Sequence, residues 1–565
     1  MNAKHLLQHF ERLSEAPDAI PRLRQFILEL AIRGKLVDGD PNDEPVSELL
    51  NRIRIEKAKC FKERQIKKQE PLSQVRAEEA WFDIPTSWHW VRLGMITQVL
   101  MGQSPPGHTY NKSGEGIPLI NGPVEFTEGP FGKTTVNQYT TAPTNLCEKG
   151  DLLLCVRGST TGRTNIAGFR ACIGRGVAAI RSFFSDQYVR LFIWRLRPHI
   201  IAMGRGIAFP SVSRQQIEEL PIPLPSLAEQ HRIVAKVNEL MSLCDDLEVA
   251  KTKREQSRDR LVSASLQRLN QPGDDEEPVR EHTRFTFNHL PRITTRPGHI
   301  KQLRQTILNL AVRGKLVSQD PNDETATELL KRISAGKEDR KRKTGDARIR
   351  FAPDPRPDQL PVVLPTRWSV QSFENLFLFI DYRGNTPPKT ADGIPLITAK
   401  NIRMGYLNRE PREYISEKTF KGWMTRGFPE IGDLFFTTEA PLANICLNDI
   451  CEPFALAQRA ICFQPYAKID TKYLMFALMS DLMQSIIEAN ATGMTAKGIK
   501  AANLKPLPIP IPPLAEQHRI VAKVDELMAL CDQLEAQLAI TETDSRRLLE
   551  TVLHEALTPA LEEAA

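Results

Sequence analysis

The chain has 565 residues, of which 41% are hydrophobic, so it is long enough for three or four domains with several buried cores. Its net charge of +6 is small, because 69 Asp and Glu nearly cancel 75 Lys and Arg, and charge alone does not indicate nucleic-acid binding. Nine cysteines without a CxxC pair argue against a zinc site, and neither an apolar run of 18 residues nor a signal-peptide pattern occurs, so we expect a cytoplasmic protein without membrane contact.

The first predicted element is a helix over residues 23–31, where apolar residues recur every three or four positions until Gly34 ends the pattern. The same pattern returns at residues 303–312, before Gly314. A base-rich segment follows each copy, Arg52–Lys68 in the first and Lys337–Arg350 in the second. These segments are either solvated loops or phosphate contacts, and the sequence leaves both alternatives open.

Two blocks of the chain recur in the same order. Residues 23–44 reappear as 303–324 with 17 of 22 positions identical, and residues 220–248 reappear as 507–535 with 24 of 29 identical. The offsets of 280 and 287 residues are far longer than the roughly 20–50 residues of a solenoid repeat. The chain is therefore a tandem duplication of a domain-sized unit.

The inserts between these blocks, Ile84–Glu219 and Leu364–Pro506, share only scattered motifs such as Gly116–Ile120 and Gly393–Ile397. Short apolar runs near glycines predict strands, and longer mixed stretches predict helices. The predicted strands include Leu152–Cys155, Val177–Ile180 and Leu434–Phe436, and the predicted helices lie in Gln187–Ile201 and Tyr473–Ile487. Like folds with different surfaces indicate a protein that recognises two different targets.

Both inserts end in Leu-Pro-Ile-Pro, at Leu220–Pro223 and Leu507–Pro510, which predicts an extended stretch because proline restricts the residue before it. Long helices with the apolar spacing of a coiled-coil seam follow. The predicted seam and partner-helix residues are Ile233, Val237, Leu240 and Leu247 in the first helix, and Ile520, Val524, Leu527, Leu534 and Leu538 in the second. The first helix turns polar at Lys251, so we expect it to fray, bend or meet another partner there.

Signatures of several enzyme classes are missing. Gly132-Lys-Thr134 lacks the first glycine of a phosphate-binding loop, and Gly174–Gly176 and Gly204–Gly206 lack the context of a dinucleotide site, so ordinary turns are predicted. Neither an amino-methyltransferase Asn-Pro-Pro-aromatic motif nor a nuclease carboxylate pair is evident. We therefore predict no catalytic residue, no metal site and no cofactor bound by this chain.

Glycine-rich turns of the inserts carry hydroxyl, amide and guanidinium groups that suit both phosphates and base edges. The candidate DNA contacts are Gln103, Tyr110, Asn111, Arg157, Arg163 and Arg205 in the first insert, and Arg383, Asn385, Lys389, Lys400, Arg403 and Lys497 in the second. The alternative is that these side chains belong to ordinary solvated loops.

The repeated blocks Leu220–Val237 and Leu507–Val524, together with Arg33–Val37 and Arg313–Val317, resemble the specificity subunit of type I restriction-modification enzymes, and the resemblance covers nearly the whole chain. It implies an α/β (α+β) fold with two similar target recognition domains of mixed, twisted β-sheet and helices. Long antiparallel coiled-coil helices would separate these domains in a pseudo-twofold tandem duplication. The implied regions are a helical region at 1–83, target recognition domains at 84–219 and 364–506, a central region at 220–363 and a C-terminal helix at 507–565.

The resemblance also implies a function. The chain would recognise a bipartite, asymmetric sequence in double-stranded DNA and direct adenine methylation and restriction by its partners. Those partners would be two methyltransferase subunits and motor-nuclease subunits, which would carry the S-adenosylmethionine, ATP and Mg²⁺. The alternative from another class is a tandem protein-interaction scaffold that does not recognise DNA; a self-sufficient methyltransferase or nuclease conflicts with the missing motifs.

Overall fold

The computed structural model describes residues 16, 18–63, 71–204, 211–270, 289, 294–382, 386–493 and 497–557. These residues divide into two compact units. Unit 1 comprises the described residues up to Lys253 together with those from Glu542 onward, and unit 2 comprises Arg254–Thr541. In the described ranges no helix has the length and apolar character needed to cross a membrane.

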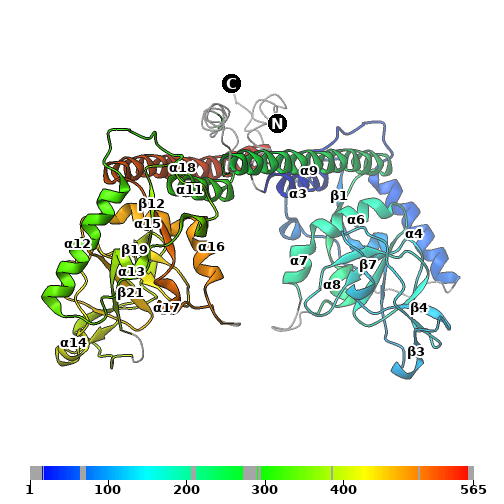
Figure 1. The fold of residues 1–565 in the computed structure, drawn as a ribbon. Helices are drawn as coiled ribbons and strands as arrows, with labels where there is room; N and C mark the ends of the chain where they lie inside the picture. The colour runs from blue at the N-terminus through cyan, green and yellow to red at the C-terminus, as the bar shows by residue number, and fades with distance from the viewer. Residues whose placement is uncertain are drawn as a thin grey trace. The chain divides into compact units, whose positions relative to one another are not determined.

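The described part of unit 1 has two helices, then short strands and a long helix, together with the end of α18 (Leu514–Leu557) from Glu542 onward (Figure 1). Its elements are α3 (Ala19–Ile32), α4 (Val46–Lys62), η1 (Ala77–Glu79), β1 (His89–Arg92), α5 (Leu93–Ile96), β2 (Thr97–Met101), η2 (Gly107–Thr109), β3 (Tyr110–Asn111), β4 (Ile117–Ile120), η3 (Pro123–Glu125), β5 (Gln138–Thr140), β6 (Leu146–Cys147), β7 (Leu152–Cys155), β8 (Thr164–Ile166), β9 (Ala171–Ile173), β10 (Val177–Ser182), α6 (Asp186–Arg195), α7 (Arg197–Ala202), α8 (Arg214–Glu218), β11 (Pro221–Leu224) and the first part of α9 (Leu227–Asn270).

Unit 2 repeats this order at its start and end and differs between the second strand and the central sheet, where it has a helix, α14. Its elements are α11 (Pro297–Val312), α12 (Ala326–Thr344), η4 (Pro357–Gln359), β12 (Ser369–Ser372), α13 (Phe373–Leu376), β13 (Phe377–Asp381), β14 (Ile394–Ile397), β15 (Ile402–Arg403), β16 (Tyr406–Leu407), β17 (Tyr414–Ile415), α14 (Glu417–Trp423), β18 (Leu434–Thr437), β19 (Ile445–Leu447), β20 (Ala455–Leu456), β21 (Ala460–Pro465), α15 (Thr471–Met479), α16 (Asp481–Ala489), α17 (Ala501–Leu504), β22 (Pro508–Ile511) and the first part of α18 (Leu514–Leu557).

Each unit is built on a four-stranded antiparallel sheet, in the order β2-β10-β7-β8 in unit 1 and β13-β21-β18-β19 in unit 2. A second sheet contains one parallel pair, β4 with β9 or β14 with β20, so the β structure is mixed as predicted. The predicted strands and helices of the inserts are confirmed, although each predicted helix is two helices, α6 with α7 and α15 with α16.

The central strands β7 and β18 are buried at every position because both faces of the sheet are covered. Leu152 and Leu154 of β7 enter a core with α3, α6 and α9, whereas Leu153 and Cys155 enter a second core with β4 and β9. In unit 2 the same alternation divides β18 and β21 between two cores. Successive side chains of one strand point to opposite faces of the sheet. A strand between two cores is therefore apolar on both faces, and its sequence is a continuous apolar run.

The Leu-Pro-Ile-Pro segments are extended as predicted, since they form β11 and β22. Each pairs with a single strand, β1 or β12, in a two-stranded antiparallel sheet. Proline is tolerated because a strand with one partner has a free edge. Tyr188 and Tyr473 fix these strands, donating to the carbonyl oxygens of Pro223 at 2.7 Å and Pro510 at 3.0 Å.

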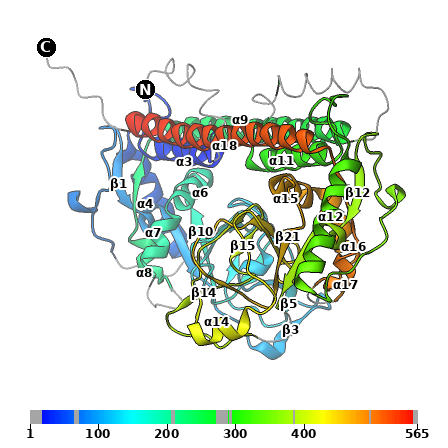
Figure 2. The same ribbon diagram turned by 60° about the vertical axis from the view of Figure 1, so that its left-hand side comes forward.

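The long helices α9 and α18 each begin in one unit and end in the other. In unit 1, α3 runs along α9 (Figure 2). Arg24 of α3 donates to Asp245 at 2.6 Å and to Glu248 at 2.7 Å, both on α9. In unit 2, Arg304 of α11 makes the same pair of contacts with Asp532 and Glu535 of α18.

Helix α9 continues without interruption to Asn270, so it does not fray near Lys251, and the alternative of another partner is confirmed. Beyond the polar stretch, Val262, Leu266 and Leu269 are buried in the core of unit 2 with α11. Arg296 at the start of α11 also pairs with Glu255 at 2.9 Å. In the sequence of α9, the apolar pattern stops near Lys251 and resumes only after Arg260, so it does not predict this contact with α11.

Candidate nucleic-acid interface

A cavity of about 460 Å³ opens in unit 1 where β7 ends. Its lining combines an apolar wall with two arginines and several polar side chains. The lining residues are Met101, Val156, Arg157, Arg175, Ser211, Val212, Ser213, Gln215, Gln216 and Glu219. One of them, Arg157, is a predicted DNA contact.

Close backbone packing positions the second arginine. Gly102 donates its N–H to the carbonyl oxygen of Val177 at 2.8 Å, and a Cβ on Gly102 would lie only 2.2 Å from the carbonyl oxygen of Gly174. The N–H of Arg175 donates to Ser104 Oγ at 3.2 Å. Any side chain at Gly102 would separate these two turns, so glycine is required for the close approach.

The cavity carries more positive than negative charge. Arg157 and Arg175 are exposed, and neither side chain has a hydrogen bond or ion pair among the described residues. The one acidic lining residue, Glu219, accepts a hydrogen bond from Gln215 Nε2 at 2.8 Å. Two unengaged guanidinium groups offer planar sets of donors for the acceptors of DNA.

The other predicted contacts of the first insert have mixed placements. Gln103 is exposed, and Tyr110 donates its hydroxyl to the carbonyl oxygen of Pro105 at 3.2 Å. Asn111 holds a local turn through Glu115, while Arg163 donates to the carbonyl oxygen of Thr127 at 3.3 Å. Arg205 lies outside the described residues.

In the second insert, three predicted cations are paired. Lys389 lies 2.7 Å and Lys400 3.8 Å from carboxylate oxygens of Glu413, and Lys497 pairs with Glu488. Arg403 lies on the β15–β16 hairpin, next to Tyr406, whose residue surface is 62% exposed. Arg383 and Asn385 lie outside the described residues.

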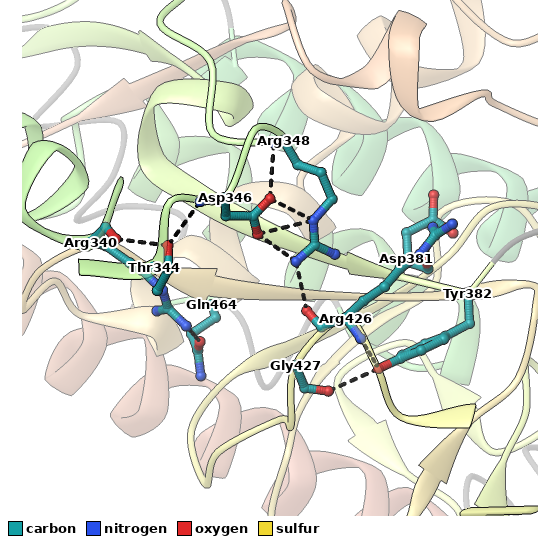
Figure 3. Close-up of polar contacts among 9 residues, drawn as sticks. All are labelled: Arg340, Thr344, Asp346, Arg348, Asp381, Tyr382, Arg426, Gly427 and Gln464. Carbon is teal, nitrogen blue, oxygen red and sulfur yellow. Dashed lines mark hydrogen bonds and ion pairs between the residues drawn. The ribbon is translucent and has the colours of Figure 1, made fainter. Parts of the chain in front are cut away.

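The base-rich segment Lys337–Arg350 is engaged in intramolecular contacts. Lys337 is buried on α12 and donates to Glu374 O and Asn375 Oδ1, both at 2.9 Å; its burial lowers its pKa to about 8. Arg340 donates to Gln464 Oε1 at 2.6 Å, and Arg348 pairs with Asp346 (Figure 3). Much of this positive charge therefore holds α12 and the following loop against the insert.

The same network continues to the end of β13. Arg348 Nη2 donates to the carbonyl oxygen of Arg426 at 3.2 Å, and the N–H of Arg426 donates to Tyr382 Oη at 3.0 Å (Figure 3). Tyr382 Oη in turn donates to the carbonyl oxygen of Gly427 at 2.9 Å, and its ring stacks on Trp423. These contacts fix the last described residue before the candidate Arg383.

The predicted seam residues are placed in the cores of their own units. Ile233 and Val237 are buried beside α3, with Leu240 and Leu247 partly buried in the same cluster. Ile520, Val524, Leu527 and Leu534 are buried beside α11, and Leu538 is partly buried there. Among the described residues, no group of three or more His, Cys, Asp or Glu is arranged to hold a metal ion.

Comparison with known families matches the type I restriction modification DNA specificity domain at residues 85–255 and 380–541. The chain belongs to this family. The chain is 31% identical over 538 residues to the EcoAI specificity subunit of Escherichia coli, covering 91% of this chain and 90% of the relative. It is 29% identical to the EcoEI specificity subunit of Escherichia coli, covering 95% and 94%.

The crystal structure of the HsdS subunit from Thermoanaerobacter tengcongensis is 28% identical to this chain. The match covers 36% of this chain and 51% of the HsdS chain, with a TM-score of 0.27. The family assignment rests on the sequence matches. The chain is the DNA specificity subunit of a type I restriction-modification system, a non-catalytic subunit without a cofactor of its own, which confirms the predicted family, fold class and function.

Arg175 is the cavity residue that sequence reasoning missed, because the Gly174–Gly176 segment was interpreted as an ordinary turn. It is a turn, but one that presents an arginine to the cavity. The available signal was an arginine flanked by two glycines directly before the apolar strand at Val177.

Proposed function

We propose that the chain recognises a bipartite, asymmetric sequence in double-stranded DNA, with one half recognised by residues 84–219 and the other by residues 364–506. The remaining proposed regions, 1–83, 220–363 and 507–565, support these domains and bind partner proteins. The pairing of different insert surfaces with nearly identical supports favours an asymmetric site over a palindrome. Double-stranded DNA is the target because this family is defined by DNA specificity.

The observation that carries the partner proposal is a repeated exposed face on the long helices. Identical exposed residues occur at equivalent positions of the two helices, and they lie three or four residues apart, on one side of each helix. They are Ala228 with Ala515, His231 with His518, Ala235 with Ala522, Glu239 with Glu526, and Leu243 with Leu530. Core packing does not explain identity at exposed positions.

Two identical surfaces suit two copies of one partner. Leu243 and Leu530 remain 51% and 40% exposed, so both side chains are accessible to a partner. We assign these surfaces to two methyltransferase subunits, which supply S-adenosylmethionine and methylate adenine in the recognised site. Motor-nuclease subunits with ATP and Mg²⁺ complete the restriction complex, in the cytoplasm.

The stoichiometry tests this assignment. The chain is co-purified with its methyltransferase, and the mass of the complex is measured for wild type, Leu243→Glu, Leu530→Glu and the double variant. Each single variant should lose one methyltransferase copy and the double variant both. Val249→Glu is the matched control, because Val249 is 68% exposed on the same helix but its counterpart is Ala536. Loss of both copies from a single variant, or of neither from the double variant, would contradict two independent sites.

The scaffold alternative makes a different prediction for DNA. A mobility-shift assay with the complex and a pool of random duplexes should select a defined sequence if the inserts recognise DNA. Equal retention of all duplexes would favour the scaffold.

A further inference from the structure

The cavity at the end of β7 has an equivalent position in unit 2, where an acidic residue stands in place of an arginine. Val212 donates its N–H to the carbonyl oxygen of Val156 at 2.9 Å, and Ile499 donates in the same way to Thr438 at 2.9 Å. The next residues, Arg157 and Glu439, therefore stand at the same place on the two sheets.

The second arginine also has a counterpart of different chemistry. The N–H groups of Val156 and Thr438 donate to the carbonyl oxygens of Gly176 and Arg459, at 2.9 and 3.1 Å. Arg175, the residue before Gly176, thus corresponds to Gln458. In unit 2 the side chain of Arg459 pairs with Glu439 at 2.7 Å, which neutralises the charge of Glu439.

This difference between the units indicates whether these two positions contact the phosphates or the bases of DNA. Every phosphate carries the same negative charge, so a position that contacts the backbone favours a cation whichever sequence is bound. Glu439, already paired with Arg459, offers no unpaired cation to a phosphate. Base edges differ in their donors and acceptors, so the side chains that recognise them are expected to differ between two units with different targets.

The arginines of unit 1 are also available for a ligand. Arg163, Lys389 and Lys497 are already engaged with protein groups, whereas the side chains of Arg157 and Arg175 have no such contact in the described part of the chain. Both line one cavity whose wall includes Met101 and Val212. Guanine presents two adjacent acceptors, O6 and N7, in the major groove, and an arginine can donate to both.

Building on the proposed function, we propose that Arg157 and Arg175 form a guanine-recognition site that fixes a G·C pair in the half-site of unit 1. The guanidinium groups donate to O6 and N7 of that guanine. The other half-site is recognised without this pair, because Glu439 and Gln458 replace it.

The test compares recognition sequences and affinities for the assembled complex of this chain with its methyltransferase. Genomic positions of methylated adenine define the sequence for wild type, Arg157→Ala, Arg175→Ala and the double variant. Arg170→Ala is the matched control, since Arg170 is exposed in the same unit but pairs with Glu148 at 3.2 Å. The variants should relax one G·C position in one half-site, with the other half-site unchanged, and should weaken discrimination there roughly 5- to 150-fold.

A duplex with 7-deazaguanine at the relaxed position isolates the proposed contact, because this base lacks the N7 acceptor. The replacement should weaken binding of wild type and of Arg170→Ala, but not of the double variant. Equal weakening of all sequences by the arginine variants, with a lower salt slope, would indicate phosphate contacts and overturn the inference, and so would unchanged recognition. If wild type itself has no defined sequence, the proposed function fails instead.

Discussion

The central sheets of the two units have the same strand order but different cores. In unit 2, Phe463 is surrounded by four phenylalanines, with ring centroids at 5.5 Å from Phe373, 5.4 Å from Phe377, 4.9 Å from Phe379 and 5.5 Å from Phe436. The equivalent positions in unit 1 hold Ile180 with Leu93, Thr97, Val99 and Leu154. One fold therefore accommodates an aromatic or a mainly aliphatic core, because the pattern of burial matters more than residue identity.

The start of the adjacent strand shows a second difference. Asp151 is buried before β7 and accepts from Arg181 Nε and Nη2, each at 2.7 Å; this bonding raises the pKa of Arg181. In unit 2 the corresponding Asp433 meets Gln464, whose Nε2 donates to it at 3.1 Å. Burial without a cationic partner raises the pKa of Asp433 to about 6. The framework thus retains the acid but not its partner.

The largest expected effect comes from the aromatic core. Phe463→Ala removes the central ring and should lower the free energy of unfolding of unit 2 by about 3–5 kcal/mol. Ile180→Ala at the equivalent site should lower that of unit 1 by about 2–3 kcal/mol, because fewer contacts are lost. Urea-dependent hydrogen exchange measured by mass spectrometry reports each unit separately. A larger loss for Ile180→Ala would refute the difference between the two cores.

The next effect depends on pH. Since the folded pKa of Asp433 lies above the unfolded value of 3.8, the folded unit binds more protons between pH 4 and 6. The contribution of Asp433 to the stability of unit 2 is therefore fully present below about pH 4. It is lost as the pH rises through 6, which lowers the free energy of unfolding by up to about 3 kcal/mol.

Asp433→Asn should remove this part of the pH dependence. The difference in stability between wild type and variant, measured by hydrogen exchange from pH 4 to 7, isolates the group from other titrations. A constant difference across that range would show that Asp433 is ionised throughout.

A smaller effect is expected when Arg181 of unit 1 is replaced by glutamine, the residue found at the equivalent position of unit 2. Arg181→Gln leaves Asp151 without its cation and should lower the free energy of unfolding by about 1–2 kcal/mol, less than for a fully buried pair because the Arg181 side chain is 40% exposed. Arg170→Gln removes an exposed pair and should change stability by less than about 0.5 kcal/mol. Similar decreases in the free energy of unfolding for the two variants would show that the burial of Asp151 does not strengthen its ion pair.

The framework was predictable from sequence because it is repeated and local. The internal copies identified the duplication, apolar runs identified β7, β10 and β18, and alternating prolines identified β11 and β22. The second half of α9 was not predictable, because its partner α11 follows later in the chain. Its polar stretch near Lys251 therefore looked like a break.

The candidate interface was less predictable than the fold. Arg157 was selected from its glycine-rich loop, but Arg175 is separated from it by 18 positions and reaches the same cavity only through strand pairing. Asn111 and Arg163 are candidate DNA contacts by residue type, and in the structure their side chains bond to loops of the insert. Residue type indicates what a side chain can bind, whereas tertiary packing decides whether it is already engaged.

The central claim is that two like-folded inserts recognise different halves of one DNA site. Its most direct test replaces residues 84–219 with the corresponding insert of another specificity subunit and maps methylated adenines over a genome for the assembled complex. We predict that one half of the recognition sequence changes while the other half and the spacing stay the same. A change in both halves, or in neither, would contradict the claim.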